Sequence, residues 1–540
     1  MQAMRNAMPN DENLRHVLVL VAGGTIGIVG DEKDNRHRRV FKLADKADFE
    51  ENILGGRNTF SVPVREGGLR RNTYVHVDFF DLRTGHSDLD AEDSQRVEIH
   101  DSAQVDSRLW VLIAKKIVET IKDEKGYNGF VILHGLDTLA YTASGVSFLL
   151  GQKMDLPIIF TGSQRPLNFF RTDAVQNVRT AITLAAGTVI HDETSSVVRE
   201  VAIYSFDRLL RATRVCMRSA SSYLTYESPN YGHLAEIGDH IIIHGHLLKK
   251  RGKAKFTPEI PAMLQAKVAI IDIYPGMNPD MLENVCDASK GKPLDGIILR
   301  AYGMGTAPTS KRILESIRTI IASGTVIMNI TQARSGRISY GIDPVSLRLF
   351  EAGVIPGSDM TAEAALAKMI YVLSMAKKKE REILLQKNLC GEQSQSIHIY
   401  DFGPGNLTEM AGHKFISQIK PLKSTNSVDM KSISYIQFRV LGLLPPCEST
   451  YSVVVKLSAK LFDPQAEEKK RNLCSLVEND ILEWHLNPEG GTTTVNLAYD
   501  ITADAFDKLP DNNLLLRIEA TSSLSWHNIS ILMFSGNQST

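Results

Sequence analysis

The chain has 540 residues and a formal net charge of −1, with 61 Lys and Arg against 62 Asp and Glu. This length exceeds what one hydrophobic core supports, so we expect about three or four domains. The charge balance argues against nucleic acid as the main partner. The longest apolar runs are strand-length, so we expect no membrane-spanning segment.

Cysteine usage and the N-terminal residues indicate the expected compartment. The five cysteines are widely spaced and form no Cys-x-x-Cys pair, which argues against a disulfide framework or a structural zinc site. Residues 1–14 are polar and lack the apolar core of a signal peptide, so we expect a flexible tail there. These features favour a cytoplasmic protein.

Strand-like and helix-like segments alternate over residues 15–246, the first expected domain. The expected strands are His16–Val21, Gly129–Leu133, Pro157–Phe160 and Val201–Tyr204, and the expected helices are Asp106–Asp123, Thr142–Leu150 and Thr172–Ala186. This alternation predicts a parallel sheet with helices on both faces. Ligands of such sheets bind at the carboxyl ends of the strands.

A second, smaller α/β domain is expected over residues 266–392, after a Lys-rich crossing over 247–265. We interpret that crossing as a solvated inter-domain segment, with a nuclear-localisation signal as the alternative. The expected strands of the second domain are Lys267–Ile273, Gly296–Leu299 and Gly324–Asn329. A long helix over Thr361–Lys378 follows, with Thr361 as its N-cap.

The last part of the chain has a different pattern. Residues 393–431 are polar and irregular and are expected to form a linker. Residues 432–540 contain runs rich in β-branched and aromatic residues with no helical pattern between them, which predicts a β-sandwich-like module whose partner the sequence does not identify. The expected strands are Ser432–Leu441, Ser452–Leu461, Ile481–Leu486, Thr492–Leu497, Leu514–Ala520 and Asn528–Phe534.

Two strand-to-turn segments carry most of the chemical information. They are Val17–Gly27, which contains Gly23-Gly24-Thr25, and Val131–Leu139, which contains His134-Gly135-Leu136-Asp137-Thr138. Glycines after a strand allow close approach of a ligand, and a following Thr hydroxyl can act as a nucleophile once a base takes its proton. A Gly-Gly-Thr turn alone is common, so this pattern needs support from the rest of the chain.

That support comes from further segments in a defined order. They are Thr161–Pro166, Thr172–Asn177, Arg211–Arg214, Ser228–Asn230, Tyr274–Gly276, Tyr302–Pro308 and Ser358–Ala364. Together with the first two, they resemble type I, cytoplasmic-type members of the asparaginase/glutaminase family over about residues 15–380. The resemblance implies a two-domain asparaginase fold, a homo-dimer or homo-tetramer, and no cofactor. It also implies hydrolysis of L-asparagine to L-aspartate and ammonia through an acyl-enzyme.

The same resemblance places individual residues. It puts the nucleophile on Thr25, and it puts the contacts to the α-amino and α-carboxylate groups of the ligand near Asp101, Ser102 and Asp137. The family's second catalytic Thr corresponds to Leu136 and its catalytic Lys to Met217.

Neighbouring residues do not replace the missing groups. Arg214 and Arg218 flank Met217, but a guanidinium stays protonated and cannot act as a general base. Ala22, Ala174 and Thr306 are smaller departures from the family pattern.

Two hypotheses follow from the altered positions. The first is an amidohydrolase with an impaired catalytic set, and the second is a non-catalytic relative that acts as an amino-acid-binding or oligomeric scaffold protein. His134 is a candidate base, although a hydrogen-bonding anchor at the strand end is the favoured interpretation. His240, His244 and His246 form a cluster, but without further ligands we expect no metal site.

Overall fold

The structure is a computed structural model. It describes residues 14–31, 40–66, 69–83, 101–122, 125–187, 197–249, 256, 258–278, 280–282, 294–338, 344–407, 410–411, 414–419, 423–424, 433–443, 455–461, 495–501, 514–520 and 524–536. The chain divides into two compact units. The first comprises Met1–Ile338, Ala352–Gln393 and Ser539–Thr540, and the second comprises Ser339–Glu351 and Ser394–Gln538.

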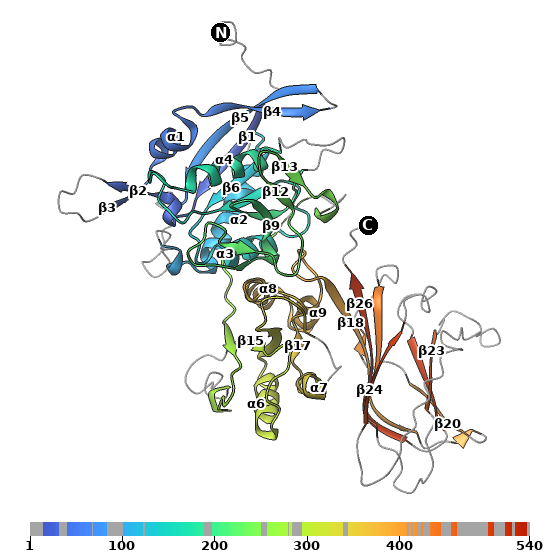
Figure 1. Cartoon of the computed structure of the whole chain (residues 1–540). Coiled ribbons are helices and arrows are strands. Elements are labelled where there is room, and N and C mark those ends of the chain that lie inside the picture. The colour runs from blue at the N-terminus through green and yellow to red at the C-terminus, as the bar shows by residue number, and fades with distance from the viewer. Residues whose placement is uncertain are drawn as a thin grey trace. The chain divides into compact units, whose positions relative to one another are not determined.

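A mixed nine-stranded sheet forms the centre of the first unit (Figure 1). Its order is β13-β12-β9-β8-β7-β6-β1-β5-β4. The bounds are β1 Leu14–Val21, β4 Thr59–Glu66, β5 Leu69–Asp81, β6 Gly129–Leu133, β7 Ile158–Thr161, β8 Val201–Ser205, β9 Arg208–Arg211, β12 Ala235–Ile237 and β13 Ile241–Ile243.

The expected parallel sheet corresponds to the centre of this sheet. Strands β5, β1, β6, β7 and β8 are parallel. The expectation did not include the antiparallel strands at both edges, β4 on one side and β9, β12 and β13 on the other. Those edge strands are short or carry charged residues, so their sequences lack the apolar runs of the buried central strands.

Helices cover both faces because the side chains of β1 alternate between two hydrophobic layers. Leu18 and Leu20 join the layer that contains residues of helices α2 and α3. Val17, Val19 and Val21 join the layer that contains residues of α1 and α4. The helices are α1 Lys46–Leu54, α2 Ser107–Ile121, α3 Leu139–Leu150 and α4 Ala174–Ala185.

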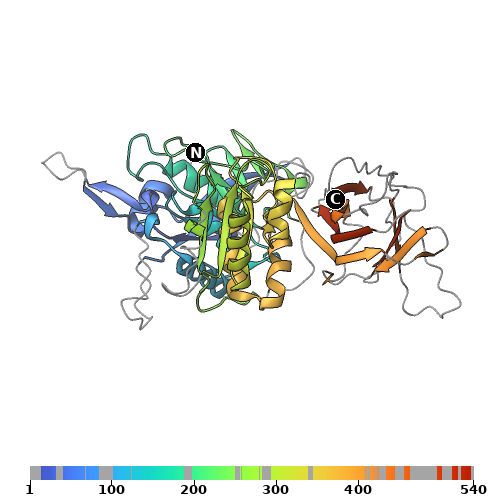
Figure 2. The same ribbon diagram turned by 90° about the horizontal axis from the view of Figure 1, so that it is seen from below.

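A four-stranded parallel sheet, in the order β14-β15-β16-β17, forms the smaller domain of the same unit. Its strands are β14 Val268–Asp272, β15 Gly296–Ala301, β16 Val326–Thr331 and β17 Ile355–Pro356, with helices α6 Lys311–Ala322, α8 Ala362–Met375 and α9 Arg381–Gln386. Figure 2 shows helices lying alongside these strands. Thr361 caps α8, as expected, because its side chain accepts a hydrogen bond from the Ala364 N–H.

Both parts of the first unit are packed together. Helix α3 contacts α8, and the rings of Phe148 and Tyr371 stack with centroids 6.0 Å apart. The fully buried Arg214 guanidinium binds Asp359 at 2.9 Å and donates to the Gly391 carbonyl at 2.6 Å. The first unit therefore consists of two α/β domains that pack against each other, as expected.

Shorter elements complete the first unit, and helix α7, Pro344–Glu351, belongs to the second. The remaining strands of the first unit are β2 Ile28–Asp31, β3 Val40–Leu43, β10 Cys216–Met217 and β11 Tyr226–Glu227. Among the helices that the structure describes, none is long and apolar enough to cross a membrane.

The second unit contains two antiparallel sheets, β21-β18-β26-β22-β24 and β19-β20-β25-β23. The bounds are β18 Gln395–Leu407, β19 Met410–Ala411, β20 Lys414–Ile419, β21 Lys423–Ser424, β22 Ile433–Leu443, β23 Val455–Leu461, β24 Val495–Ile501, β25 Leu514–Ala520 and β26 Leu524–Gly536. The expected linker over 393–431 was wrong in this respect, because that range contains β18 to β21. The expected strand Ile481–Leu486 lies outside the described residues.

Candidate active site

The topology singles out the carboxyl ends of β1 and β6. Strand β1 lies between β5 and β6 in the sheet. After β1 the chain forms β4 and β5 on one side of it, and it then crosses to form β6 on the other side. In open α/β sheets, such a reversal of strand order opens a crevice beyond the carboxyl ends of the strands. The register pairs Val21 with Leu133, so both signature turns begin at this crevice.

The two turns touch backbone to backbone. Gly23 and Gly24 have φ values of 92° and 82°, which favour glycine. A Cβ on Gly24 would lie 2.2 Å from the Cα of Gly135, and a Cβ on Gly135 would lie 2.4 Å from the Ser102 Oγ. The first turn, the second turn and Ser102 therefore form one close-packed group.

Thr25 opens a 3₁₀ turn, Thr25–Gly27, directly after these glycines. The Arg83 side chain, 1% exposed, holds this turn by donating to the Gly27 carbonyl at 2.8 Å and to the Ala44 carbonyl. Arg83 is itself fixed by hydrogen bonds to Asp81 at 2.8 Å. The turn that begins at Thr25 is thus held at Gly27 by a charge-assisted network.

The second turn places Leu136 and Asp137 differently. Asp137 is exposed, whereas Leu136 is half-buried and packs against the core. Leu136 also lies close to Gly162, because a Cβ built on Gly162 would be 2.7 Å from the Leu136 Cδ2. The Thr138 hydroxyl donates to the Ser102 carbonyl at 2.8 Å. Asp101 is exposed, and its carboxylate accepts from the Ala103 N–H at 2.9 Å. Of the residues expected at the site, Ser102 lies against the turns and Asp101 lies next to it.

His134 is positioned as an anchor. Its ring is fully buried, and Nδ1 lies 2.8 Å from the Gly135 carbonyl oxygen. Burial lowers the pKa of His134 to about 4, so the imidazole is neutral near pH 7 and donates through Nδ1. This arrangement favours a structural role for His134 over that of the missing base.

The position expected for the Lys is occupied by Met217 on β10, which is 37% exposed. Met217 pairs with Tyr226 on β11, and the buried Tyr226 hydroxyl donates to the Leu136 carbonyl. Burial raises the pKa of the Glu363 carboxyl, in the first turn of α8, and the Met217 backbone N–H acts in the opposite direction. Arg214 binds Asp359 instead, so it does not restore a titratable amine.

Comparison with known proteins identifies the family. Residues 16–249 match "Asparaginase, N-terminal" and residues 267–383 match "Glutaminase/Asparaginase C-terminal domain". The chain belongs to the asparaginase family. The match ends before β18, so the strands after Gln393 lie outside the family domains.

Individual members of the asparaginase family show the same extent of similarity. L-asparaginase 1 from Escherichia coli (strain K12) is 35% identical over 293 residues, which cover 54% of this chain and 81% of that protein. The human 60 kDa lysophospholipase is 32% identical over 302 residues, covering 55% of this chain and 49% of that protein. The crystal structure of L-asparaginase I from Vibrio cholerae aligns with a TM-score of 0.56 and 28% identity over 70% of this chain and 99% of that chain.

Two residues near these candidate positions are not indicated by the sequence. The sequence marks Glu363 only as an acid in the first turn of a helix, and no motif singles out Tyr226. Tyr226 lies two residues before Ser228-Pro229-Asn230 and fits an apolar position of the sequence pattern. Nothing in the sequence therefore indicates that its hydroxyl contacts Leu136. Tyr226 reaches Leu136 through a contact distant in sequence, which periodicity does not reveal.

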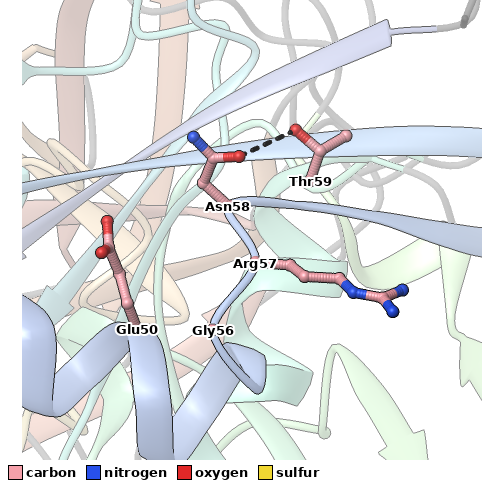
Figure 3. Close-up of a pocket in the computed structure, with 5 residues that line it drawn as sticks. All are labelled: Glu50, Gly56, Arg57, Asn58 and Thr59. Atoms are coloured by element: carbon pink, nitrogen blue, oxygen red, sulfur yellow. Dashed lines mark hydrogen bonds between the residues drawn. The ribbon is translucent and has the colours of Figure 1, made fainter.

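The other candidates are the histidine cluster and a surface pocket. Within the described part of the chain, no group of three His, Cys, Asp or Glu side chains could hold a metal ion. His244 instead lies 3.6 Å from Glu236. A shallow surface pocket of about 440 Å³ is lined by Glu50, Gly56, Arg57, Asn58 and Thr59 (Figure 3). Since Thr59 pairs with His76, opposite the start of β1, this pocket lies at the other end of the strands from Thr25.

Proposed function

We propose that this asparaginase-family protein binds L-asparagine, or a similar small amide, where β1 and β6 end. We further propose that it hydrolyses the amide far more slowly than an asparaginase with a complete catalytic set. The observation that supports this proposal is the close-packed group of Gly24, Gly135 and Ser102 beside Thr25, next to a Leu136 and a Met217 that carry neither hydroxyl nor amine. The name of the E. coli relative, L-asparaginase 1, supplies the substrate class.

The proposed roles follow from the chemistry of each side chain. The Asp137 carboxylate pairs with the α-ammonium of the ligand, and Asp101 and Ser102 line the same α-amino and α-carboxylate end. The Thr25 hydroxyl attacks the side-chain amide carbon, and ammonia leaves with the transferred proton. Water then hydrolyses the resulting ester, which releases aspartate and restores Thr25. This reaction needs no cofactor.

The missing groups explain the expected low rate. A Thr hydroxyl is a weak nucleophile until a base accepts its proton. Leu136 and Met217 cannot transfer protons, and loss of general acid–base help typically costs about 10²–10⁴ in rate. If both groups act as a unit, their losses do not add. The second candidate function is therefore complete loss of chemistry, with the site kept for binding or for an oligomeric scaffold.

Ammonia release and asparagine binding test the proposal together. Turnover is measured with purified full-length protein, and affinity is measured by calorimetry in a Thr25→Ala variant that cannot consume the ligand. The combined variant Leu136→Thr with Met217→Lys is expected to raise turnover by about 10²-fold or more. Leu136→Val with Met217→Leu is the matched control, because it changes the same positions without adding a hydroxyl or an amine.

Each outcome has a defined meaning. Turnover at ordinary enzyme rates that disappears in Thr25→Ala would contradict the impaired catalytic set. Asparagine binding without any turnover would favour the non-catalytic candidate. Failure to bind asparagine, or unchanged binding in Asp137→Asn, would contradict the proposed site. The expected homo-dimer or homo-tetramer stays a prediction, which light scattering would test.

A further inference from the structure

A buried tyrosine holds the second signature turn directly before Asp137. Tyr226 on β11 is 1% exposed, and its hydroxyl donates to the Leu136 carbonyl. Burial raises the pKa of Tyr226, so the hydroxyl keeps its proton and stays a donor. A buried tyrosine hydroxyl ordinarily needs such a partner, and here the partner is the backbone of the candidate site.

Tyr226 is itself held in place by its neighbours in the fold. It pairs with Met217 across β10 and β11, and the Arg218 N–H donates to the carbonyl of the adjacent Thr225 at 2.7 Å. The Tyr226 hydroxyl therefore reaches Leu136 from a fixed support. One residue thus links Leu136 and Met217, the two positions that were expected to differ from the family's Thr and Lys.

The backbone after Asp137 is held as well. Thr138 follows Asp137 directly, and its hydroxyl donates to the Ser102 carbonyl at 2.8 Å. Asp137 itself is exposed, whereas Leu136 and Thr138 on either side of it are half-buried. An exposed carboxylate is thus attached to a backbone that is fixed on both sides, so less conformational freedom is lost when it binds a ligand.

We propose that Tyr226 is a positioning residue of this site, which fixes the backbone at Leu136 and so places the Asp137 carboxylate for the α-ammonium of the ligand. The inference rests on the proposed function, in which Asp137 makes that contact. Thr138 acts in the same way from the other side of Asp137. Without the Tyr226 hydroxyl, the Leu136 carbonyl loses this donor and the turn gains freedom, which weakens the ion pair between Asp137 and the ligand.

The test compares two ligands that differ only in the α-amino group. Dissociation constants of L-asparagine and of succinamate, which is asparagine without its α-amino group, are measured by ligand-observed NMR, because this method reaches millimolar affinities. The proteins are the full-length Thr25→Ala parent and its Tyr226→Phe and Tyr204→Phe variants. Tyr204 is the matched control, because it is 2% exposed and its hydroxyl also donates to a backbone carbonyl, that of Phe206 at 2.5 Å.

The expected results are ratios of affinity. Tyr226→Phe weakens the binding of asparagine about fivefold or more, because a hydrogen bond that holds the turn is lost. It leaves the binding of succinamate within about twofold, because this ligand has no α-ammonium for Asp137 to bind. Tyr204→Phe leaves both affinities within about twofold, although it removes a buried hydroxyl of the same kind.

Several results would overturn the inference. Unchanged asparagine binding in Tyr226→Phe, or an equal loss for asparagine and succinamate, would contradict the positioning role and leave the proposed function intact. The same selective loss in Tyr204→Phe would also contradict that role, because it would show a general effect of buried hydroxyls. Failure of asparagine to bind the parent would contradict both proposals. If Tyr226→Phe does not fold, Thr138→Val decides, because it frees the same turn on the other side of Asp137, and an unchanged ratio of the two affinities would contradict the inference.

Discussion

His134 shows how one buried residue couples this site to the stability of the fold. Its imidazole is fully buried with Nδ1 on the Gly135 carbonyl, and burial lowers its pKa from 6.5 to about 4. Below pH 6.5 the His134 side chain binds a proton in the unfolded chain but stays neutral in the folded chain. Its contribution to the unfolding free energy is therefore fully present above pH 6.5 and is lost as the pH falls toward about 4. The full shift corresponds to about 3 kcal/mol of unfolding free energy.

Urea unfolding at several pH values checks this prediction. Between about pH 7 and pH 5, the unfolding free energy should fall by about 2 kcal/mol more in the parent than in His134→Gln. His240→Gln is the control, because His240 is 68% exposed, and it should keep the slope of the parent. Equal slopes in the parent and His134→Gln would contradict the prediction.

At the level of single residues, the resemblance predicted Thr25, Ser102 and Asp137 in one region. Ser102 lies against Gly135, and the roles of the three residues stay predictions. Arg83, which holds the Thr25 turn, was not predicted, because an arginine after a strand is ordinarily solvated. Its burial depends on Gly27 and Ala44 carbonyls that only the folded chain brings to it.

At the level of elements, the contact between the two signature turns is the feature most sensitive to substitution. In Gly24→Ala, the new Cβ would lie 2.2 Å from the Gly135 Cα at a φ of 82°, so both strain and overlap with backbone are expected. We predict a loss of unfolding free energy above about 2 kcal/mol, together with loss of asparagine binding.

Gly56→Ala separates strain from overlap. Gly56 has a φ of 75°, but a Cβ there would meet nothing within 4 Å, so only the strain of about 1 kcal/mol is expected. Thermal unfolding of both variants gives the comparison. Equal losses in Gly24→Ala and Gly56→Ala would show that the two turns are not in close contact.

Buried elements were predicted more accurately than edge elements. The strand Gly129–Leu133 was predicted with its observed bounds, and the helix over Asp106–Asp123 is observed as α2, capped by Asp106. These segments have strong apolar patterns. Strand β5 is an exception, because it lies inside the sheet between β1 and β4 and buries Val75 and Val77, yet it was missed although its second half alternates as a strand does. Its place beside β1 is set by pairing across the sheet, which no local pattern encodes.

At the level of the whole molecule, the boundary between the two units lies earlier than the sequence indicated. The sequence placed a linker over 393–431, but β18 begins at Gln395 and pairs along its length with β26, whereas β20 pairs with β25. Among the described strands, none after Gln393 pairs with a strand before it. The polar residues of β18 and its two glycines, Gly403 and Gly405, make it difficult to recognise as a strand from the local sequence.

Two truncations test this boundary. A chain that ends at Gln393 keeps every described strand of the two asparaginase-family domains with its partners. A chain that ends at Lys431 adds β18 and β20 without β26 and β25, so it exposes unpaired strand edges that promote aggregation. Both keep Ser339–Glu351, so that segment does not distinguish them. We predict that the shorter chain is monodisperse by light scattering and binds asparagine within about threefold of the full chain, while the longer one aggregates. A well-folded chain ending at Lys431 beside an insoluble one ending at Gln393 would place the boundary after β21 instead.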